Sequence, residues 1–275
     1  MKRLLVCLLL VGVMGCGKSE QAKEKPSNNA LEIMTKDLNA PLQPEPEVHF
    51  QGQGSVSGLV VLEGEAPAAS VFTLKEDMQE LTGKETITRQ PWQVSENGGL
   101  ADCVVTLRNT DRKNAVQPEP LAGATMVKNG TNFIPRILVV TKGTTLDYRN
   151  ENSPCNCFEV RGRGLFRSRS ILVPAGRRMD LELEAVGFCR VFSNLRPYYD
   201  AWIHVVDTPY YIITAQDGRF EFPEVAAGEY RLQVWHSGVK TLKREIAVLD
   251  GKKQDLKFQF ILAKAKELGH EPDDE

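Results

Sequence analysis

The stretch from Tyr148 to Val206 decides the fold of this chain. Its first part reads Asn150-Glu-Asn-Ser-Pro-Cys155-Asn-Cys157-Phe, and its last part reads Gly187-Phe-Cys189-Arg-Val-Phe192-Ser-Asn-Leu195-Arg. Short apolar runs beside Asn, Pro and Gly are typical of strands that end in turns. The two parts are therefore predicted to be cysteine-bearing strand ends, joined by an extended and turn-rich segment.

Similar short strands continue on both sides of this stretch, and helical periodicity is almost absent. We expect strands over residues 54–62, 100–107, 133–140, 145–150, 171–174, 179–184, 201–206, 208–214, 218–222, 229–236, 243–250 and 254–261. Residues 216–218 read Gln-Asp-Gly, which predicts a tight turn between two strands. In the strand that ends at Leu107, alternation places Cys103, Val105 and Leu107 on the inward face. Regular short strands with Gly and Pro turns indicate an all-β protein built from sandwiches.

The chain begins with the features of an export signal. Basic residues at 2 and 3 precede an apolar run over 4–14, which is too short to span a bilayer. The run ends Val13-Met-Gly-Cys16, which resembles a bacterial lipobox, in which the cysteine is lipidated and becomes the new N-terminus. The alternative is an ordinary cleavage site. The lipobox interpretation makes residues 1–15 a signal peptide and Cys16 the lipidation site; Gly17, rather than Asp, after it predicts an outer-membrane lipoprotein facing the periplasm.

Composition separates a folded body from polar ends. Residues 16–53 are rich in Lys, Glu, Asn, Gln and Pro and poor in aromatics, which predicts a disordered tether. Residues 263–275 form an acidic tail. Removal of residues 1–15 takes away Lys2 and Arg3 and no acid, so the formal net charge of −2 becomes −4. This balance excludes a chain that binds nucleic acid through overall positive charge.

Four cysteines remain besides Cys16 in the exported chain, at positions 103, 155, 157 and 189. An even number in an oxidising compartment suggests disulfides, and three pairings are compatible with four cysteines. Cys155 and Cys157 are poor partners for each other, because residues two apart on a strand point the same way.

Residues 54–260 resemble a family of exported bacterial proteins described as plastocyanin-like or methylamine-utilisation-like. The shared motifs include Phe133-Ile-Pro-Arg-Ile-Leu-Val-Val-Thr-Lys-Gly143 and Gly228-Glu-Tyr-Arg-Leu-Gln-Val-Trp-His236. The resemblance implies a cupredoxin-like Greek-key sandwich over residues 54–207. It also implies a small carboxypeptidase-regulatory-like, or transthyretin-like, sandwich over residues 208–262.

In cupredoxins, His-Asn-Val and Cys-x-x-His-x-x-Met segments hold copper through two imidazoles, a thiolate and a weak axial thioether. Cys155-Asn-Cys157 stands here in place of His-Asn-Val, and Cys189, Phe192 and Leu195 stand in place of Cys, His and Met. Phenylalanine and leucine cannot bind a metal. The four histidines of the chain lie at positions 49, 204, 236 and 270, and none has the spacing of a replacement copper ligand. The resemblance therefore implies a degenerate copper site without a cofactor.

Two fates for the cysteines follow from the resemblance. If Cys155 and Cys189 occupy former ligand positions, a disulfide between them replaces the metal and stabilises the fold by roughly 2–4 kcal/mol. Cys103 and Cys157 then form a second bridge. The alternative is a thiolate cluster of Cys155, Cys157 and Cys189 that binds Cu(I) or Zn(II).

The segment between the two site motifs is rich in arginine. A docking patch for an acidic protein or a polyanion is predicted at Arg161, Arg163, Arg167 and Arg169; the alternative is a solvated hairpin. No Ser/His/Asp arrangement, phosphate-binding glycine loop or paired carboxylates indicate catalysis, and His236 after Trp235 is interpreted as structural. We expect a lipid-anchored binding or scaffold protein of the cell envelope, not an enzyme. The alternatives are a copper-handling or electron-transfer protein, and carbohydrate or peptide binding by the C-terminal sandwich.

Overall fold

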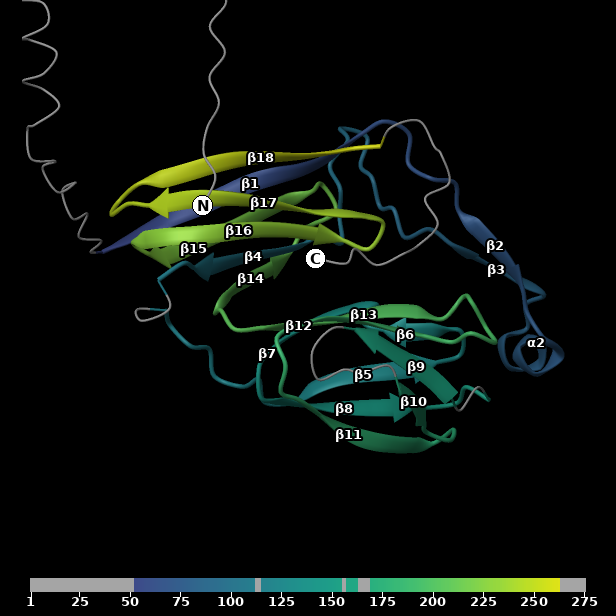
Figure 1. The fold of residues 1–275 in the computed structure, drawn as a ribbon. Coiled ribbons are helices and arrows are strands. Elements are labelled where there is room, and N and C mark those ends of the chain that lie inside the picture. The colour runs from purple at the N-terminus through teal and green to yellow at the C-terminus, as the bar shows by residue number, and fades with distance from the viewer. Residues whose placement is uncertain (1–51, 112–114, 155–156, 163–168, 263–275) are drawn as a thin grey trace, which may run out of the picture. The chain divides into compact units, whose positions relative to one another are not determined.

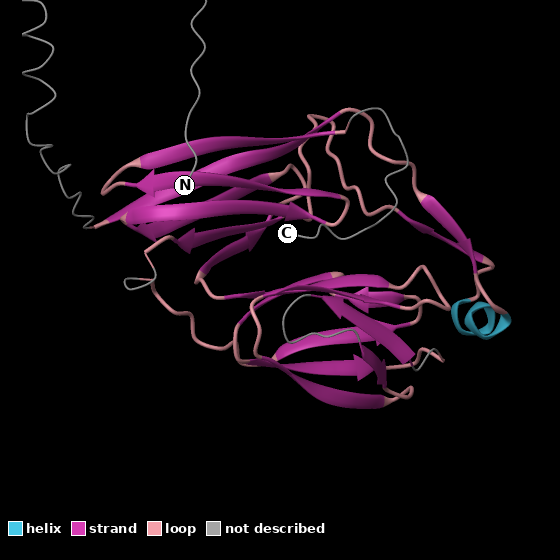
Figure 2. Cartoon of the chain, in the orientation of Figure 1, coloured by secondary structure: helices cyan, strands magenta, loops and turns pink. Residues whose placement is uncertain are grey.

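The structure is a computed structural model that describes residues 52–111, 115–154, 157–162 and 169–262. Its described part consists of strands and one short helix, α2 (Glu76–Thr82), as Figures 1 and 2 show. The all-β prediction is therefore confirmed. No helix in these residues is both long enough and apolar enough to cross a membrane. The predicted signal peptide, the acidic tail and residues 16–51 of the predicted tether lie outside the described residues, whereas Gln53, the last residue of that tether, begins the strand Gln53–Glu63.

The first sandwich is made of a five-stranded and a four-stranded sheet. The five-stranded sheet has the order β10 (Arg169–Leu172), β9 (Cys157–Gly162), β12 (Gly187–Phe192), β13 (Asp200–Val206), β7 (Ile137–Thr141). The four-stranded sheet has the order β11 (Arg177–Leu183), β8 (Thr144–Asn150), β5 (Ala124–Asn129), β6 (Asn132–Ile134). Most neighbours are antiparallel, but β13 pairs with β7, and β5 with β8, in parallel.

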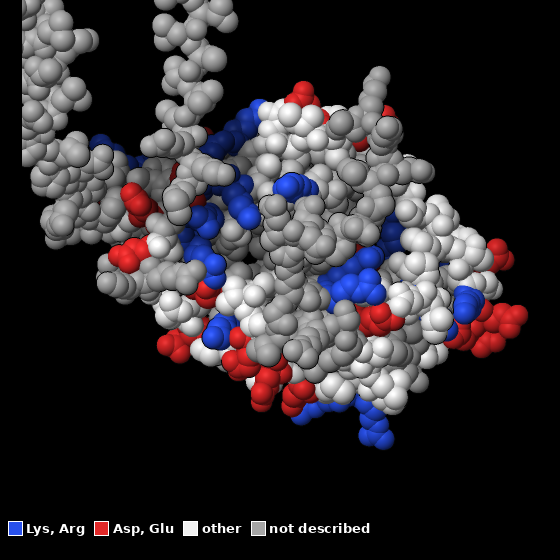
Figure 3. All heavy atoms as spheres, viewed as in Figure 1, with Lys and Arg blue, Asp and Glu red and all other residues white. Residues whose placement is uncertain are grey.

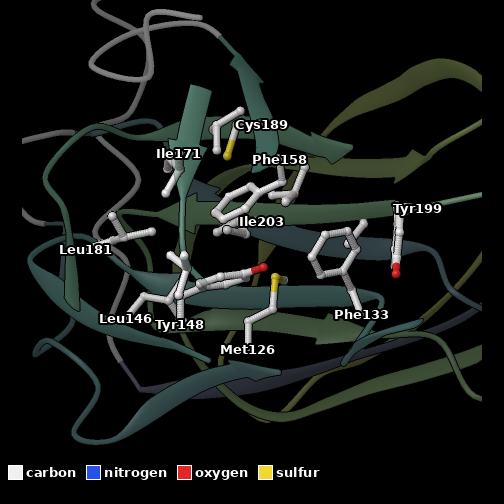
Figure 4. Packing of buried hydrophobic residues seen from close by; sticks show 14 of the residues in the cluster. Met126, Phe133, Leu146, Tyr148, Phe158, Ile171, Leu181, Cys189, Tyr199 and Ile203 are labelled. Carbon is white, nitrogen blue, oxygen red and sulfur yellow. The ribbon is translucent and has the colours of Figure 1, made fainter. Parts of the chain in front are cut away.

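The core of the first sandwich draws its side chains from both sheets, as Figure 4 shows. Tyr148 of β8 and Phe158 of β9 pack with their ring centroids 4.3 Å apart. Met126 of β5 and Leu183 of β11 are fully buried beside them. Alternate residues of β8 are buried, because only one face of this sheet is covered. Burial of these side chains provides the main stabilisation of the sandwich.

The second sandwich is built from two separate segments of the chain. One sheet has the order β15 (Arg219–Ala226), β1 (Gln53–Glu63), β18 (Lys253–Ile261). The other has the order β14 (Tyr210–Ile213), β4 (Val104–Asn109), β16 (Gly228–His236), β17 (Val239–Val248). The predicted inward set of Cys103, Val105 and Leu107 is confirmed, since all three are fully buried in this core.

This assembly differs from the expected division of the body at residue 207. Strands β1 and β4 belong to the second sandwich rather than the first. The reason is long-range pairing: β1 runs parallel to β18 over nine register positions from Ser55 to Glu63, and β4 lies between β14 and β16. The alternation of apolar residues in each strand predicts which face is buried, but it does not predict which strand lies beside it.

The predicted Asp217-Gly218 turn holds these segments together. Gly218 has φ +81°, and a Cβ there would lie 2.3 Å from the carbonyl oxygen of Val60 in β1. Its own carbonyl accepts the N–H of Val60 at 2.9 Å. Only glycine combines this left-handed backbone with such a close approach, so the turn is also a contact between distant strands.

An insertion between β1 and β4 contributes to the first sandwich. Strands β2 (Ser70–Thr73) and β3 (Thr86–Arg89) form a ribbon, with α2 between them. Met78 of α2 is fully buried in the first core. Arg196 forms a two-pronged ion pair with Asp77, and Arg89 donates to the carbonyl oxygens of Tyr198 and Thr131. The insertion therefore packs against the loop that follows β12.

A third apolar cluster joins the two sandwiches. It contains Val104 and Trp235 from the second sandwich, and Ile137, Val139, Trp202 and Val206 from the first. The rings of Trp202 and Trp235 lie 5.0 Å apart in an edge-to-face arrangement. An ion pair of 2.7 Å between Arg136 and Asp102 also links the sandwiches. Strand β13 consequently has both faces covered, and six of its seven residues are buried.

Candidate functional site

The motif residues of β12 divide between the two faces of their sheet. Cys189 is fully buried in the first core. Phe192 lies three residues further along the same strand, and an odd spacing on a strand places side chains on opposite faces. Leu195 follows the strand and is 76 % exposed. The structure therefore does not bring Cys189, Phe192 and Leu195 together.

Phe192 is held by charged side chains on the outer face of the sheet. The guanidinium carbons of Arg161 and Arg190 lie 5.1 and 5.0 Å from the centroid of its ring. The register explains this arrangement: Arg190 lies directly opposite Arg161, and Phe192 lies opposite Glu159 on one side and Asp200 on the other. These two cation–π contacts stabilise the side chain of Phe192 in this position, and no metal is needed to hold it there.

Acidic neighbours offset the two arginines. Glu159 lies 3.8 Å from Arg161, and Asp200 accepts a hydrogen bond of 2.6 Å from Nε of Arg190. Asn194 in turn donates to the carboxylate of Glu159. The side chain of Arg161 nevertheless stays 57 % exposed. Arg161 therefore presents an exposed cationic group beside the buried ring of Phe192. We call Arg161, Arg190 and Phe192 the arginine clamp.

The two cysteines whose side chains the structure describes, Cys103 and Cys189, lie in different hydrophobic cores. Cys103 lies in the core of the second sandwich and carries a free thiol. Burial raises the pKa of this thiol to about 12, which makes it unreactive at neutral pH. The predicted bridge from Cys103 to Cys157 is therefore not formed: Cys103 belongs to one sandwich, and the strand that starts at Cys157 belongs to the other.

The other predicted pairing cannot be placed in the same way. Cys155 lies outside the described residues, so the Cys155–Cys189 bridge stays a prediction. Cys189 pairs through its backbone with Gly162, at the end of β9 remote from Cys157. No group of three or more His, Cys, Asp or Glu side chains with metal-binding geometry occurs in the part of the chain that the structure describes.

Of the predicted docking patch, only the side chain of Arg161 is described. Arg169 begins β10 and pairs with Val160 through its backbone, whereas Arg163, Arg167 and the lipidation site Cys16 lie outside the described residues. On the face that Figure 3 shows, acidic and basic side chains alternate without a broad field of one sign. Next to Arg161 itself lies Glu159, at 3.8 Å, so the clamp is not part of a uniformly basic surface.

Sequence reasoning missed the burial of His204 among aromatic side chains between the two sandwiches. His204 of β13 lies 4.2 Å from the ring of Trp235 and stacks on Phe188 at 5.5 Å. Burial alone lowers the pKa of His204 to about 3. The signal was present in Ala201-Trp-Ile-His-Val-Val206, which lacks polar alternation because both faces of the strand are covered. His236 accepts a hydrogen bond from the N–H of Gly238 through Nδ1, which agrees with its structural interpretation.

The fold and the site define an all-β protein of two joined sandwiches, with an aromatic and arginine-rich end on the first. A family model for the carboxypeptidase regulatory-like domain matches residues 191–260, which confirms that expectation for the C-terminal strands. No curated protein matches the chain.

Solved structures similar to the chain include copper proteins. A reduced Cu(I) form of an amicyanin mutant is 14 % identical, with a TM-score of 0.26; the match covers 33 % of this chain and 97 % of the amicyanin chain. A purple cupredoxin from Nitrosopumilus maritimus is 16 % identical, with a TM-score of 0.25, over 30 % of this chain and 99 % of its own. A copper-containing nitrite reductase from Thermus scotoductus SA-01 is 19 % identical, with a TM-score of 0.25, over 33 % of this chain and 27 % of its own.

Proposed function

We propose that this chain is a non-enzymatic binding protein of the bacterial cell envelope, anchored by a lipid on Cys16. In this proposal the cupredoxin-like sandwich serves as a scaffold, and its former copper site has become a structural and docking surface. The observation that carries the proposal is the arginine clamp. At the position where the resemblance implies an imidazole, Phe192 makes cation–π contacts with Arg161 and Arg190, while Cys189 points into the apolar core.

The arrangement supports docking better than metal chemistry for a physical reason. A mononuclear copper centre needs two imidazoles and a thiolate that converge on one point. Cys189 and Phe192 diverge instead. The ring of Phe192 contacts two arginines, and the acidic side chains beside them are already engaged in ion pairs with those arginines. An exposed guanidinium beside an aromatic ring is a group that binds carboxylates and other anions. We infer that the partner presents acidic groups.

The purified full-length protein is expected to retain no stoichiometric copper and to show no visible thiolate-to-copper absorption. Protein exported to an oxidising compartment is incubated with Cu(II) or Cu(I), desalted and measured by elemental analysis and absorption. Divergence of Cys189 and Phe192 is the reason for the expected result. One tightly held copper per chain would establish the alternative, a copper-handling or electron-transfer protein, and would contradict the proposal.

Arg161→Ala is expected to weaken binding to a polyanion about two- to fivefold, because an exposed ionic contact contributes up to about 1 kcal/mol. Immobilised heparin is the probe, and elution is measured against salt concentration. Arg219→Ala is the control: it removes an arginine of the second sandwich that is also ion-paired, with Asp217, and that is more exposed, at 76 % against 57 % for Arg161. Equal elution of the two variants, or no retention of the unaltered protein at low salt, would refute docking at the clamp.

A further inference from the structure

A cleft of about 420 Å³ opens on the second sandwich, at the end of β4. Its wall includes Arg108 and Asn109 of β4, Arg231 of β16, and Asp207 and Tyr210 around the link between β13 and β14. A volume of this size lies within the range of natural small-molecule sites. The docking surface described above is on the other sandwich, so this cleft is a separate feature.

Two arginines stand side by side in the wall of the cleft. Arg231 lies directly opposite Arg108 in the antiparallel β4–β16 ladder. Like charges in this position are unfavourable unless they are compensated. Asp207 compensates Arg108 with a two-pronged ion pair, and Glu245 accepts a hydrogen bond of 2.7 Å from Nε of Arg231.

These ion pairs leave hydrogen-bonding capacity towards the cleft. Asp207 engages Nε and Nη2 of Arg108, and Glu245 engages only Nε of Arg231. A guanidinium has five N–H donors, so each arginine keeps donors for a ligand. The side chains of Arg108 and Arg231 are 46 % and 51 % exposed. Each carboxylate has further lone pairs, and the side chain of Asp207 is 29 % exposed.

Apolar groups lie next to these polar ones. Tyr210 is held in place because its hydroxyl accepts the N–H of Ala226 at 3.1 Å. Its ring packs edge-to-face on Tyr230 at 5.8 Å. Val116 also lines the cleft and is 55 % exposed. The cleft therefore combines adjacent donors and acceptors with apolar patches for C–H groups.

We propose that this cleft binds a neutral saccharide unit. Each sugar hydroxyl both donates and accepts a hydrogen bond, so it is matched by a guanidinium and a carboxylate held side by side. The charges of Arg108, Arg231, Asp207 and Glu245 cancel, and this balance favours a neutral polyhydroxylated ligand over a free anion. Val116, Pro209 and Tyr210 supply contacts for the apolar face of the sugar ring.

The test uses the full-length protein in NMR titrations with maltose, cellobiose and diacetylchitobiose, and with inorganic phosphate as an ionic probe. We expect at least one disaccharide to bind with a millimolar Kd and to shift resonances of β4, β16 and the link after β13. Arg231→Ala is expected to weaken this binding roughly tenfold, the effect of losing a charge-assisted hydrogen bond. Arg219→Ala is the matched control: it removes an exposed arginine that is also ion-paired but does not line the cleft, and it should bind as the unaltered protein does.

Three results would overturn the proposal. The first is binding of phosphate without binding of any disaccharide, which would make the cleft an anion site. The second is the absence of saturable shifts for every probe. The third is equal saccharide affinity of Arg231→Ala and the unaltered protein. None of these results bears on the arginine clamp, because Arg161 lies on the first sandwich, so failure here and failure of the proposed docking are distinguishable.

Discussion

Trp235→Ala will lower the free energy of unfolding by about 3–5 kcal/mol, the usual cost of removing a large buried aromatic side chain. The indole is 7 % exposed and contacts Trp202, His204 and Phe188 of the first sandwich, with centroid distances of 5.0, 4.2 and 5.7 Å. Its loss opens a cavity in the apolar cluster that joins the sandwiches. We therefore expect the two sandwiches to unfold in separate transitions, measured by urea denaturation with tryptophan fluorescence and circular dichroism.

The conservative variant Trp235→Phe supplies the control, because it keeps an aromatic ring in the same cluster. It should cost clearly less and preserve a single transition. A double-mutant cycle with Trp202→Ala then measures the coupling between the two rings. A loss below about 1 kcal/mol in Trp235→Ala, or independent effects in the cycle, would show that this cluster does not hold the sandwiches together.

Acidification will destabilise the protein before most carboxylates are protonated. In the folded state burial lowers the pKa of His204 to about 3, and burial followed by the nearby Arg136 lowers the pKa of His236 to about 4. The unfolded chain binds protons on both histidines below their ordinary pKa of about 6.5. The unfolded state thus binds more protons, so stability falls as the pH drops from about 6.5 towards these folded values.

The expected loss is about 1.4 kcal/mol per pH unit for each histidine, or roughly 2 kcal/mol for His204 between pH 6.5 and pH 5. His204→Leu removes this contribution while it keeps an apolar side chain between Phe188 and Trp235. Unfolding free energies at pH 7.5 and pH 5, measured by urea denaturation, give the comparison. The idea fails if His204→Leu and the unaltered protein lose equal stability over this interval.

The arrangement of local elements was largely predictable, and the strand partners were not. Gln216-Asp-Gly218 indicates a turn from residue type alone, because glycine tolerates a positive φ. That Gly218 then lies against β1 depends on a partner more than 150 residues away. Alternation likewise predicts that Cys103, Val105 and Leu107 are buried together, but it does not say which sandwich receives them.

The candidate site shows the same division. Cys-x-x-Phe over residues 189–192 allows either a loop, in which the two side chains converge, or a continued strand, in which they diverge. The backbone pairing of Phe192 with Glu159 and Asp200 decides for the strand. The arginine clamp follows from this register, because Arg161 and Arg190 become direct neighbours only when β9 and β12 are aligned in this way.

The sequence by itself determined that the body of this protein is all-β, where most strands and turns lie, and which residue types are missing from a copper centre. These features are local, because each depends only on a short segment of the sequence. They follow from the two-residue repeat of a strand, the conformational freedom of glycine and the chemistry of individual side chains. Only the tertiary structure decided that β1 and β4 complete the second sandwich, that Trp235 and His204 are buried between the sandwiches, and that Arg108 meets Arg231 beside a cleft. Those features depend on register between distant strands, which arises from the joint burial of many side chains and which no short stretch specifies.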